Sequence, residues 1–160
     1  MPTLTITRGL PGSGKSTWAR AYVAEDPAGR ARVNRDDLRS MLHDGVFVAR
    51  EVDKLGLRVR HGTEPAVQAA RDAMLRTLLR RGLDVVCDDT NLPDGVAQHL
   101  ADLAAQHGAA FTIQDFRDVP LEVCLQRNAA RSGRAQVAEG VVMDMHARYI
   151  ADQEEVDARG

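Results

Sequence analysis

Apolar positions along this chain follow two periods, which predict alternating strands and helices. Short stretches rich in β-branched and apolar residues predict strands at 3–7, 31–34, 83–87 and 110–116. Apolar spacings of three and four, with the polar residues that begin helices, predict helices up to residue 24, from 36 to 42, and over 63–81, 93–106 and 119–130. A last helix carries an apolar stripe of Val137, Val141, Met145 and Tyr149. The charged, poorly periodic residues 44–62 are predicted to form a loop with helical turns.

This order of elements indicates the fold class. Strands that alternate with helices build a parallel sheet covered by helices on both faces. We therefore predict an α/β fold whose mainly parallel central sheet has four or five strands. The sequence shows no repeat, low-complexity tract or linker, so residues 1–160 are expected to form a single domain.

The Gly-rich segment after the first strand has a chemical meaning. Residues 9–16 read GLPGSGKS and fit G-x-x-x-x-G-K-[ST] between a predicted strand and a predicted helix. Glycines let backbone N–H groups surround phosphate oxygens, and the lysine and serine serve the β/γ-phosphates and Mg²⁺. The segment is thus predicted to bind a nucleoside triphosphate (NTP) and Mg²⁺ through Gly12, Ser13, Gly14, Lys15, Ser16 and Thr17.

Composition narrows the class of protein. The formal net charge of −2 excludes a protein that coats nucleic acid non-specifically. No apolar run is long enough to span a membrane, and the N-terminus lacks the pattern of a signal peptide. Cys87 and Cys124 are expected to be buried thiols, which indicates a reducing compartment. We therefore expect a cytoplasmic protein of a phage or bacterial type. Without a guanine-reading N-K-x-D motif, a compact kinase is favoured over a GTPase switch.

Acidic residues follow two of the predicted strands. Asp88 and Asp89 lie where the carboxyl edge of a parallel sheet binds ligands, although an ordinary turn also favours such residues. Asp36 and Asp37 follow another strand, and a carboxylate there could take a proton from an attacking hydroxyl. One of these two is expected to cap the helix instead, and their spacing does not distinguish them. Arg39 is expected to lie on the same side of the helix as Asp36, placed for an anionic acceptor.

Two arginines near the end of a predicted helix are candidates for a lid. Arg127 and Arg131 are four residues apart and would project from one face. Over the phosphate-binding loop, they would neutralise charge on the transferred group. Taken alone, however, they fit a solvated helix end better, because cations there match the helix dipole.

Together these segments resemble a known family, the kinase domain of the phage-type 5′-hydroxyl polynucleotide kinases, which heal nucleic-acid ends. The resemblance rests on GLPGSGKSTWAR, VNRDDLR, DDTNL, FRDVPLEVCLQRNAARSGRAQV and MHARY, in the family's order and spanning nearly the whole chain. It implies a P-loop phosphotransferase with an arginine-bearing lid. It also implies transfer of the γ-phosphate of an NTP to the 5′-OH end of DNA or RNA.

The resemblance implies a role for each matching residue. Asp36 would be the general base, Arg39 would grip the phosphate on the 3′ side of the acceptor nucleotide, and Arg131 would lie nearer the transferred group than Arg127. Asp89 matches the acid of the second strand motif, which with Ser16 would hold Mg²⁺. The acceptor pocket would comprise Arg39, Asp89, Thr90, Val137 and Val141. For the two valines, the helical stripe favours a place in the core.

The chain departs from the family in two respects, and two other functions stay open. The lid is one residue longer between Arg131 and Val137, and no D-x-D-G-T phosphatase motif follows the kinase segment. A small-molecule kinase acting on a sugar, nucleoside or antibiotic hydroxyl would carry the same phosphate-binding loop. A nucleotide-dependent binding module would carry it too, but would leave Asp36, Arg39 and the lid arginines without a role. The sequence is compatible with a homo-oligomer and does not indicate one.

Overall fold

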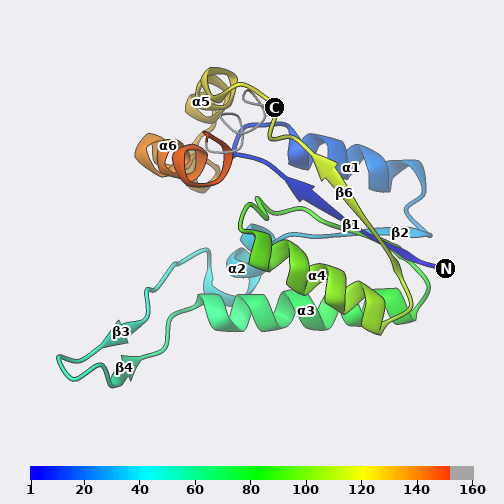
Figure 1. Cartoon of the computed structure of the whole chain (residues 1–160), viewed down its shortest axis with the longest axis horizontal. Helices are drawn as coiled ribbons and strands as arrows, with labels where there is room; N and C mark the ends of the chain where they lie inside the picture. The colour runs from blue at the N-terminus through cyan, green and yellow to red at the C-terminus, as the bar shows by residue number, and fades with distance from the viewer. Residues whose placement is uncertain (152–160) are drawn as a thin grey trace.

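A parallel four-stranded sheet forms the centre of the computed structural model, which describes residues 1–151 (Figure 1). Its strand order is β2-β5-β1-β6, with β1 at Thr3–Arg8, β2 at Arg30–Val33, β5 at Asp84–Cys87 and β6 at Ala110–Asp115. All three neighbouring pairs are parallel, as the sequence predicted. Residues 152–160 of the predicted domain lie outside the described residues.

Helices cover both faces of this sheet. In Figure 1, α3 (Glu64–Arg80) and α4 (Asp94–Gln106) lie on one face and α1 (Lys15–Glu25) on the other. The short α2 (Arg35–His43) follows β2 directly. Beyond the carboxyl end of β1, the chain forms a smaller lobe of α5 (Leu121–Ala129) and α6 (Glu139–His146), with the short turns η1 (Gly133–Ala135) and η2 (Ala147–Ala151). The predicted α/β fold is confirmed.

The alternation of side chains along β1 explains this layering. Leu4 and Ile6 are fully buried and belong to the main core with residues of α3 and α4, including Leu75 and Leu100. The intervening Thr5 points to the other face, where its hydroxyl shares a hydrogen bond of 2.8 Å with Thr112 on β6. Because successive strand residues face opposite sides, this strand separates an apolar layer from a more polar one.

A second core cluster joins the phosphate-binding loop to the smaller lobe. Leu10 packs with Leu92, Cys124, Val142 and Ile150. The predicted stripe on the last helix is therefore wrong at one position, because Val142 is fully buried whereas Val141 is 45% exposed. The helix begins only at Glu139, so the spacing from Val137 does not continue into it.

The region 44–62 is also different from its prediction. It forms a protruding antiparallel hairpin of β3 (Glu51–Val52) and β4 (Arg58–Arg60) rather than a loop with helical turns (Figure 1). Asp53 closes its turn, since Oδ1 accepts backbone N–H groups of Leu55 at 2.9 Å and Leu57 at 2.8 Å. Such side-chain bonds to the backbone favour a turn over a helix. We call residues 45–62 the arm.

The two cysteines lie in the interior, as the sequence predicted. Both thiols are fully buried, and burial raises the pKa of Cys87 and of Cys124 because the thiolate is poorly solvated inside the protein. Within residues 1–151, no helix combines the length and apolarity that crossing a bilayer requires.

Candidate active site

Three loops meet at the carboxyl edge of the sheet. Val33 on β2 and Ile6 on β1 both align with Cys87 on β5, so the chain leaves all three strands at one level. The loops enclose a cleft of about 260 Å³. Its lining includes most of the predicted site residues: Gly14, Lys15, Ser16, Asp36, Arg39, Asp89, Thr90, Arg131 and Val137. Strand ends in a parallel sheet converge on one edge, which is why segments distant in sequence share this cleft.

The phosphate-binding loop depends on glycine conformations. Gly12 has φ +84° and Gly14 has φ +100°, in a region that side chains disfavour. A Cβ on Gly12 would also lie 2.4 Å from the carbonyl oxygen of Cys124 on α5. Gly12 is therefore required both by the turn and by the close approach of the lobe.

Replacing Gly12 with alanine is expected to lower the free energy of unfolding by about 3 kcal/mol. The matched control is Gly82→Ala, because Gly82 has nearly the same φ of +81° but no atom within 4 Å of an added Cβ. That control should lose only about 1 kcal/mol, the cost of the backbone conformation alone. Urea denaturation measures both values, and equal losses would contradict a steric role for the contact with Cys124.

Lys15 is held inside the loop that it serves. It begins α1, is 7% exposed, and donates from Nζ to the carbonyl of Leu10 at 2.6 Å. Burial lowers the pKa of Lys15 to about 8, because its ammonium is removed from water; Asp88 opposes this shift and Arg131 adds to it. A bound triphosphate would supply the negative charge that this buried ammonium lacks.

A lowered pKa of Lys15 predicts proton uptake on NTP binding. Above pH 8 the free protein holds Lys15 largely neutral, whereas phosphate oxygens favour its charged form. NTP affinity should therefore fall as pH rises through about 8, and up to about one proton should be taken up at about pH 9. Calorimetry in two buffers of different ionisation enthalpy measures the uptake. The variant Lys15→Arg stays charged and should show none, so equal uptake in both proteins would assign the proton elsewhere.

The start of α2 resolves which acid caps the helix. The cap is Asn34, whose Oδ1 accepts the backbone N–H of Asp37 at 3.0 Å. The expectation that Asp36 or Asp37 caps the helix is thus wrong, and both carboxylates lie in its first turn. Because Asn34 caps the helix with its own side chain, Asp36 is available for other contacts.

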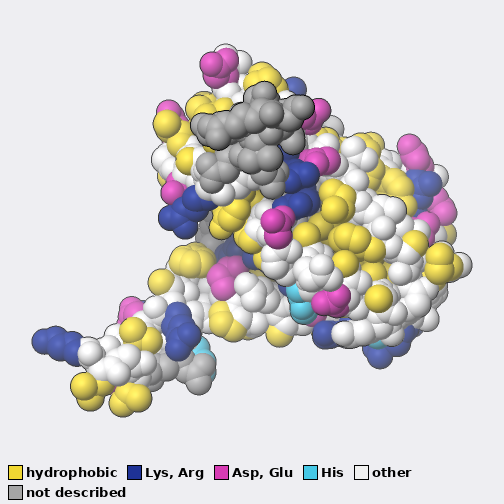
Figure 2. Space-filling view, in the orientation of Figure 1, with side chains coloured by type: hydrophobic (Ala, Val, Ile, Leu, Met, Phe, Trp, Pro, Cys, Tyr) yellow, Lys and Arg dark blue, Asp and Glu magenta, His cyan; other side chains and the backbone are white. Residues whose placement is uncertain are grey.

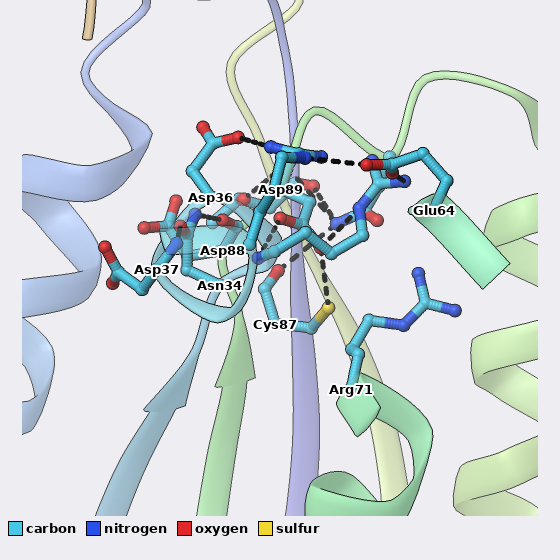
Figure 3. A network of polar contacts seen from close by, with 12 residues as sticks. Asn34, Asp36, Asp37, Glu64, Arg71, Cys87, Asp88 and Asp89 are labelled. Atoms are coloured by element: carbon cyan, nitrogen blue, oxygen red, sulfur yellow. Dashed lines mark hydrogen bonds and ion pairs between the residues drawn. The ribbon is translucent and has the colours of Figure 1, made fainter. Parts of the chain in front are cut away.

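Asp36 and Arg39 form an ion pair at the mouth of the cleft. Nη1 of Arg39 donates to Oδ1 of Asp36 at 2.5 Å, one helical turn apart as predicted (Figure 3). Arg39 also donates from Nε to Glu64 at the start of α3, at 2.6 Å. The bond to Glu64 and the pair with Asp36 raise the pKa of Arg39, because both carboxylates stabilise its charged form. The side chain of Asp36 is 83% exposed, open to an incoming acceptor.

The two acids after β5 face different partners. Asp89 is buried and accepts from Arg35 twice, from its backbone N–H at 2.9 Å and from Nε at 3.1 Å. Burial raises the pKa of Asp89, and Arg35 opposes that shift. Asp88 accepts from Arg32 Nε at 2.6 Å through Oδ2, while its buried Oδ1 has no hydrogen-bond partner within residues 1–151. Figure 3 shows Asp88 and Asp89 at the ends of the strands.

This arrangement adds a candidate metal ligand. Asp88 exerts the strongest electrostatic effect on Lys15 of any acid, whereas that of Asp89 is weaker. A buried carboxylate oxygen without a donor, in the cleft that Ser16 also lines, fits a hydrated divalent cation. Asp88 is therefore a further candidate for binding Mg²⁺, and the role predicted for Asp89 stays a prediction. Among the described residues, no group of three acidic, His or Cys side chains forms a metal site.

Sequence reasoning did not single out Arg35, Glu64 or Arg32. Each is a charged partner that orients a predicted residue: Arg35 holds Asp89, Glu64 holds Arg39, and Arg32 holds Asp88. Arg32 carries a sequence signal, because a cation inside a short strand needs a partner. Glu64 follows the unpredicted arm and carries no comparable signal.

The predicted lid arginines lie near the loop. Arg127 on α5 donates from Nη1 to the carbonyl of Gly12 at 3.5 Å. Arg131 follows α5, is exposed, and lines the cleft with Nη1 at 3.5 Å from the carbonyl of Ala135.

The other predicted residues are divided between the cleft and its surroundings. Thr90 lines the cleft, and its carbonyl accepts from Gly9 N at 3.1 Å. Val137 reaches the cleft, but Val141 and Thr17 do not line it. Thr17 is exposed on the first turn of α1. The structure therefore brings together most, but not all, of the predicted acceptor pocket.

Comparison with known proteins supplies the family context. The profile of a family described as the AAA domain matches residues 4–151. A chain of the Pnkp1/Rnl/Hen1 RNA repair complex is 25% identical, with a TM-score of 0.73 over 96% of this chain. A putative kinase from Chloroflexus aurantiacus is 20% identical, with a TM-score of 0.62 over 99% of this chain and 80% of that one.

APS kinase CysC of Mycobacterium tuberculosis, solved with AMPPNP and APS, is also similar. It is 20% identical, with a TM-score of 0.52 over 81% of this chain and 69% of that chain. These neighbours share a P-loop kinase-like fold. This chain spans 45% of the length of the matching chain in the RNA repair complex.

Proposed function

The chain belongs to the AAA domain family and has a P-loop kinase-like fold, and on that premise we propose that it transfers the γ-phosphate of an NTP to the 5′-OH end of DNA or RNA. One observation carries this proposal. Asp36 and Arg39, the candidate base and the candidate phosphate grip, line the same cleft as Lys15 and Ser16 of the phosphate-binding loop. A shared cleft for donor and acceptor supports direct transfer between them.

The proposed reaction begins with removal of a proton from the acceptor. Oδ1 of Asp36 accepts from Arg39, so Oδ2 is the oxygen available to accept the proton of a 5′-hydroxyl. As the O–H bond breaks, the hydroxyl oxygen forms a bond to the γ-phosphorus and the bond to the β–γ bridging oxygen breaks. The NDP leaves with that electron pair. Arg39 positions the acceptor by binding its first internucleotide phosphate.

Cations stabilise the charge of the transferred group. Lys15 would bind β- and γ-phosphate oxygens, and Arg131 would neutralise charge that develops on the phosphoryl group. Ser16, with Asp88 or Asp89, would hold Mg²⁺, which would reduce the repulsion between the phosphate oxygens. Asp89 orients Arg35, which also lines the cleft. Each role uses a residue that faces the cleft.

Incubation with γ-labelled ATP, Mg²⁺ and a single-stranded 5′-OH oligonucleotide tests the proposal. Label should appear at the 5′ end of DNA, RNA or both, and the same oligonucleotide with a 5′-phosphate should stay unlabelled. Sugars and nucleosides form a parallel acceptor panel. Label on these acceptors with none on any oligonucleotide would assign a small-molecule kinase instead. NTP binding with no labelled product would indicate a binding module.

A further inference from the structure

A second hollow adjoins the cleft on the side of α1 and α2. It measures about 370 Å³ and shares Ser16, Asp36, Arg39 and Arg131 with the cleft. Beyond these it extends to Arg20 and Ser40 and reaches Gly45, where the arm begins. The two hollows therefore form one groove from the phosphate-binding loop to the base of the arm.

The arginines that line this second hollow differ in whether a carboxylate neutralises their charge. Arg32 pairs with Asp37 and Asp88, and Arg39 pairs with Asp36 and Glu64. Arg20, in contrast, has no carboxylate partner among residues 1–151. It follows Ser16 by four positions on α1, so both lie on one helix face and both line the hollow. An arginine without an internal counterion, next to a phosphate site, is suited to an external anion.

The arm carries an exposed aromatic side chain close in sequence to Gly45, the residue at which the groove meets the arm. Phe47 lies two residues after Gly45 and is 62% exposed, in contrast to the stacked and partly buried pair of Trp18 and Tyr22. Among the large apolar side chains that are exposed in the described part of the chain, Phe47 alone is aromatic. Figure 2 shows hydrophobic and basic side chains on the arm, which stands clear of the main body. Proteins that bind single-stranded nucleic acid combine a positively charged groove with exposed aromatic rings on which bases stack.

We propose that this groove holds the acceptor strand beyond its terminal nucleotide, with Arg20 on the second internucleotide phosphate and Phe47 stacked on a base further along. The inference rests on the function proposed above and adds that, in a longer single-stranded acceptor, the protein contacts at least three nucleotides. Arg39 lines both hollows, which makes it the point where the strand passes from the catalytic cleft into the groove. Contacts to phosphate and to the face of a base carry no sequence information, so binding is independent of sequence.

The dependence of KM on acceptor length tests the role of Arg20. Arg20→Gln should raise KM about tenfold for a single strand of roughly six nucleotides, with kcat unchanged and KM for a nucleoside 3′-phosphate unaffected. The slope of log KM against log salt should fall by about 0.7, the loss of one phosphate contact on a single strand. Arg80→Gln is the control, because Arg80 is an exposed arginine in the last turn of α3, on another part of the molecule.

A second pair of variants tests the base contact. Phe47→Ala should raise KM for the same oligonucleotide about fivefold, as expected for a lost stacking contact. Leu55→Ala removes an 84% exposed apolar side chain from the same arm and should have no effect. An equal effect of both variants would show that the arm acts through general apolar contact, which contradicts stacking on Phe47.

Two further outcomes would contradict the proposed binding of the strand in this groove. A rise in KM for the NTP with Arg20→Gln would place the donor in the hollow, and an unchanged KM for every oligonucleotide would show that no strand contacts Arg20. Fluorescence anisotropy with a labelled strand repeats the comparison without turnover. Strand binding that depends on Arg20 but yields no phosphate transfer would contradict the proposed function alone. Transfer that is the same with and without Arg20 would contradict the groove alone.

Discussion

Replacing Asp36 with asparagine is expected to lower kcat about 10²–10⁴-fold while leaving NTP binding within about twofold, because the amide keeps the shape of the side chain but cannot accept the proton. The side chain of Asp36 is 83% exposed, so the substitution should not disturb folding. Rapid-quench measurement of end labelling gives kcat, and calorimetry gives the Kd for NTP. Arg39 keeps its contact with Glu64 in this variant, so acceptor binding should largely remain.

The neighbouring acid provides a matched control for Asp36. Asp37 lies in the same first turn of α2 and is 63% exposed, but it pairs with Arg32 rather than Arg39. Asp37→Asn should therefore change kcat by less than about threefold. Full activity of Asp36→Asn, or equal losses in the two variants, would remove Asp36 from the role of general base.

Removing the guanidinium of Arg131 is expected to lower kcat by about 10³-fold, near the lower limit for an arginine that neutralises a transferring phosphoryl group. Arg131 is exposed and has no carboxylate partner among the described residues, so Arg131→Ala should change the free energy of unfolding by less than about 0.5 kcal/mol. A single-turnover assay at saturating NTP isolates the chemical step from binding.

Two other arginines of the same lobe separate this effect from general charge. Arg127 contacts the carbonyl of Gly12, so Arg127→Ala should mainly raise KM for the NTP. Arg148 forms an exposed pair with Asp144, and Arg148→Ala should leave both parameters unchanged. If Arg131→Ala raised only KM, Arg131 would bind the donor in the ground state rather than act on the transferred group.

Local rules were sufficient for the elements whose chemistry lies within a few residues. The glycines, Lys15 and Ser16 of the phosphate-binding loop are set by backbone conformation and by the needs of phosphate, so the motif appears in the sequence directly. The parallel sheet followed from alternation of strands and helices. The spacing of three residues between Asp36 and Arg39 similarly predicted that both lie on one side of α2, where they form an ion pair.

The sequence predictions failed where the outcome depends on which of several side chains makes a particular contact. Two acids in the first turn of α2 seemed suited to cap it, but the Asn34 side chain already accepts the N–H of Asp37. On the last helix, Val142 is buried in place of Val141, because packing against Leu10 and Cys124 decides which face is inside. The arm formed a hairpin because Asp53 bonds backbone N–H groups of its turn, a signal that apolar periodicity does not contain.

The sequence by itself determined that the chain has a parallel sheet with a phosphate-binding loop, and that carboxylates and arginines follow its strands. Only the tertiary structure decided which of these groups meet. Asp88 and Asp89 are adjacent in the chain and both follow the end of β5, so their spacing does not indicate which partner each one binds. Arg32 on β2 binds Asp88 and Arg35 at the start of α2 binds Asp89, because the sheet places β2 beside β5 and brings both arginines to the same strand end.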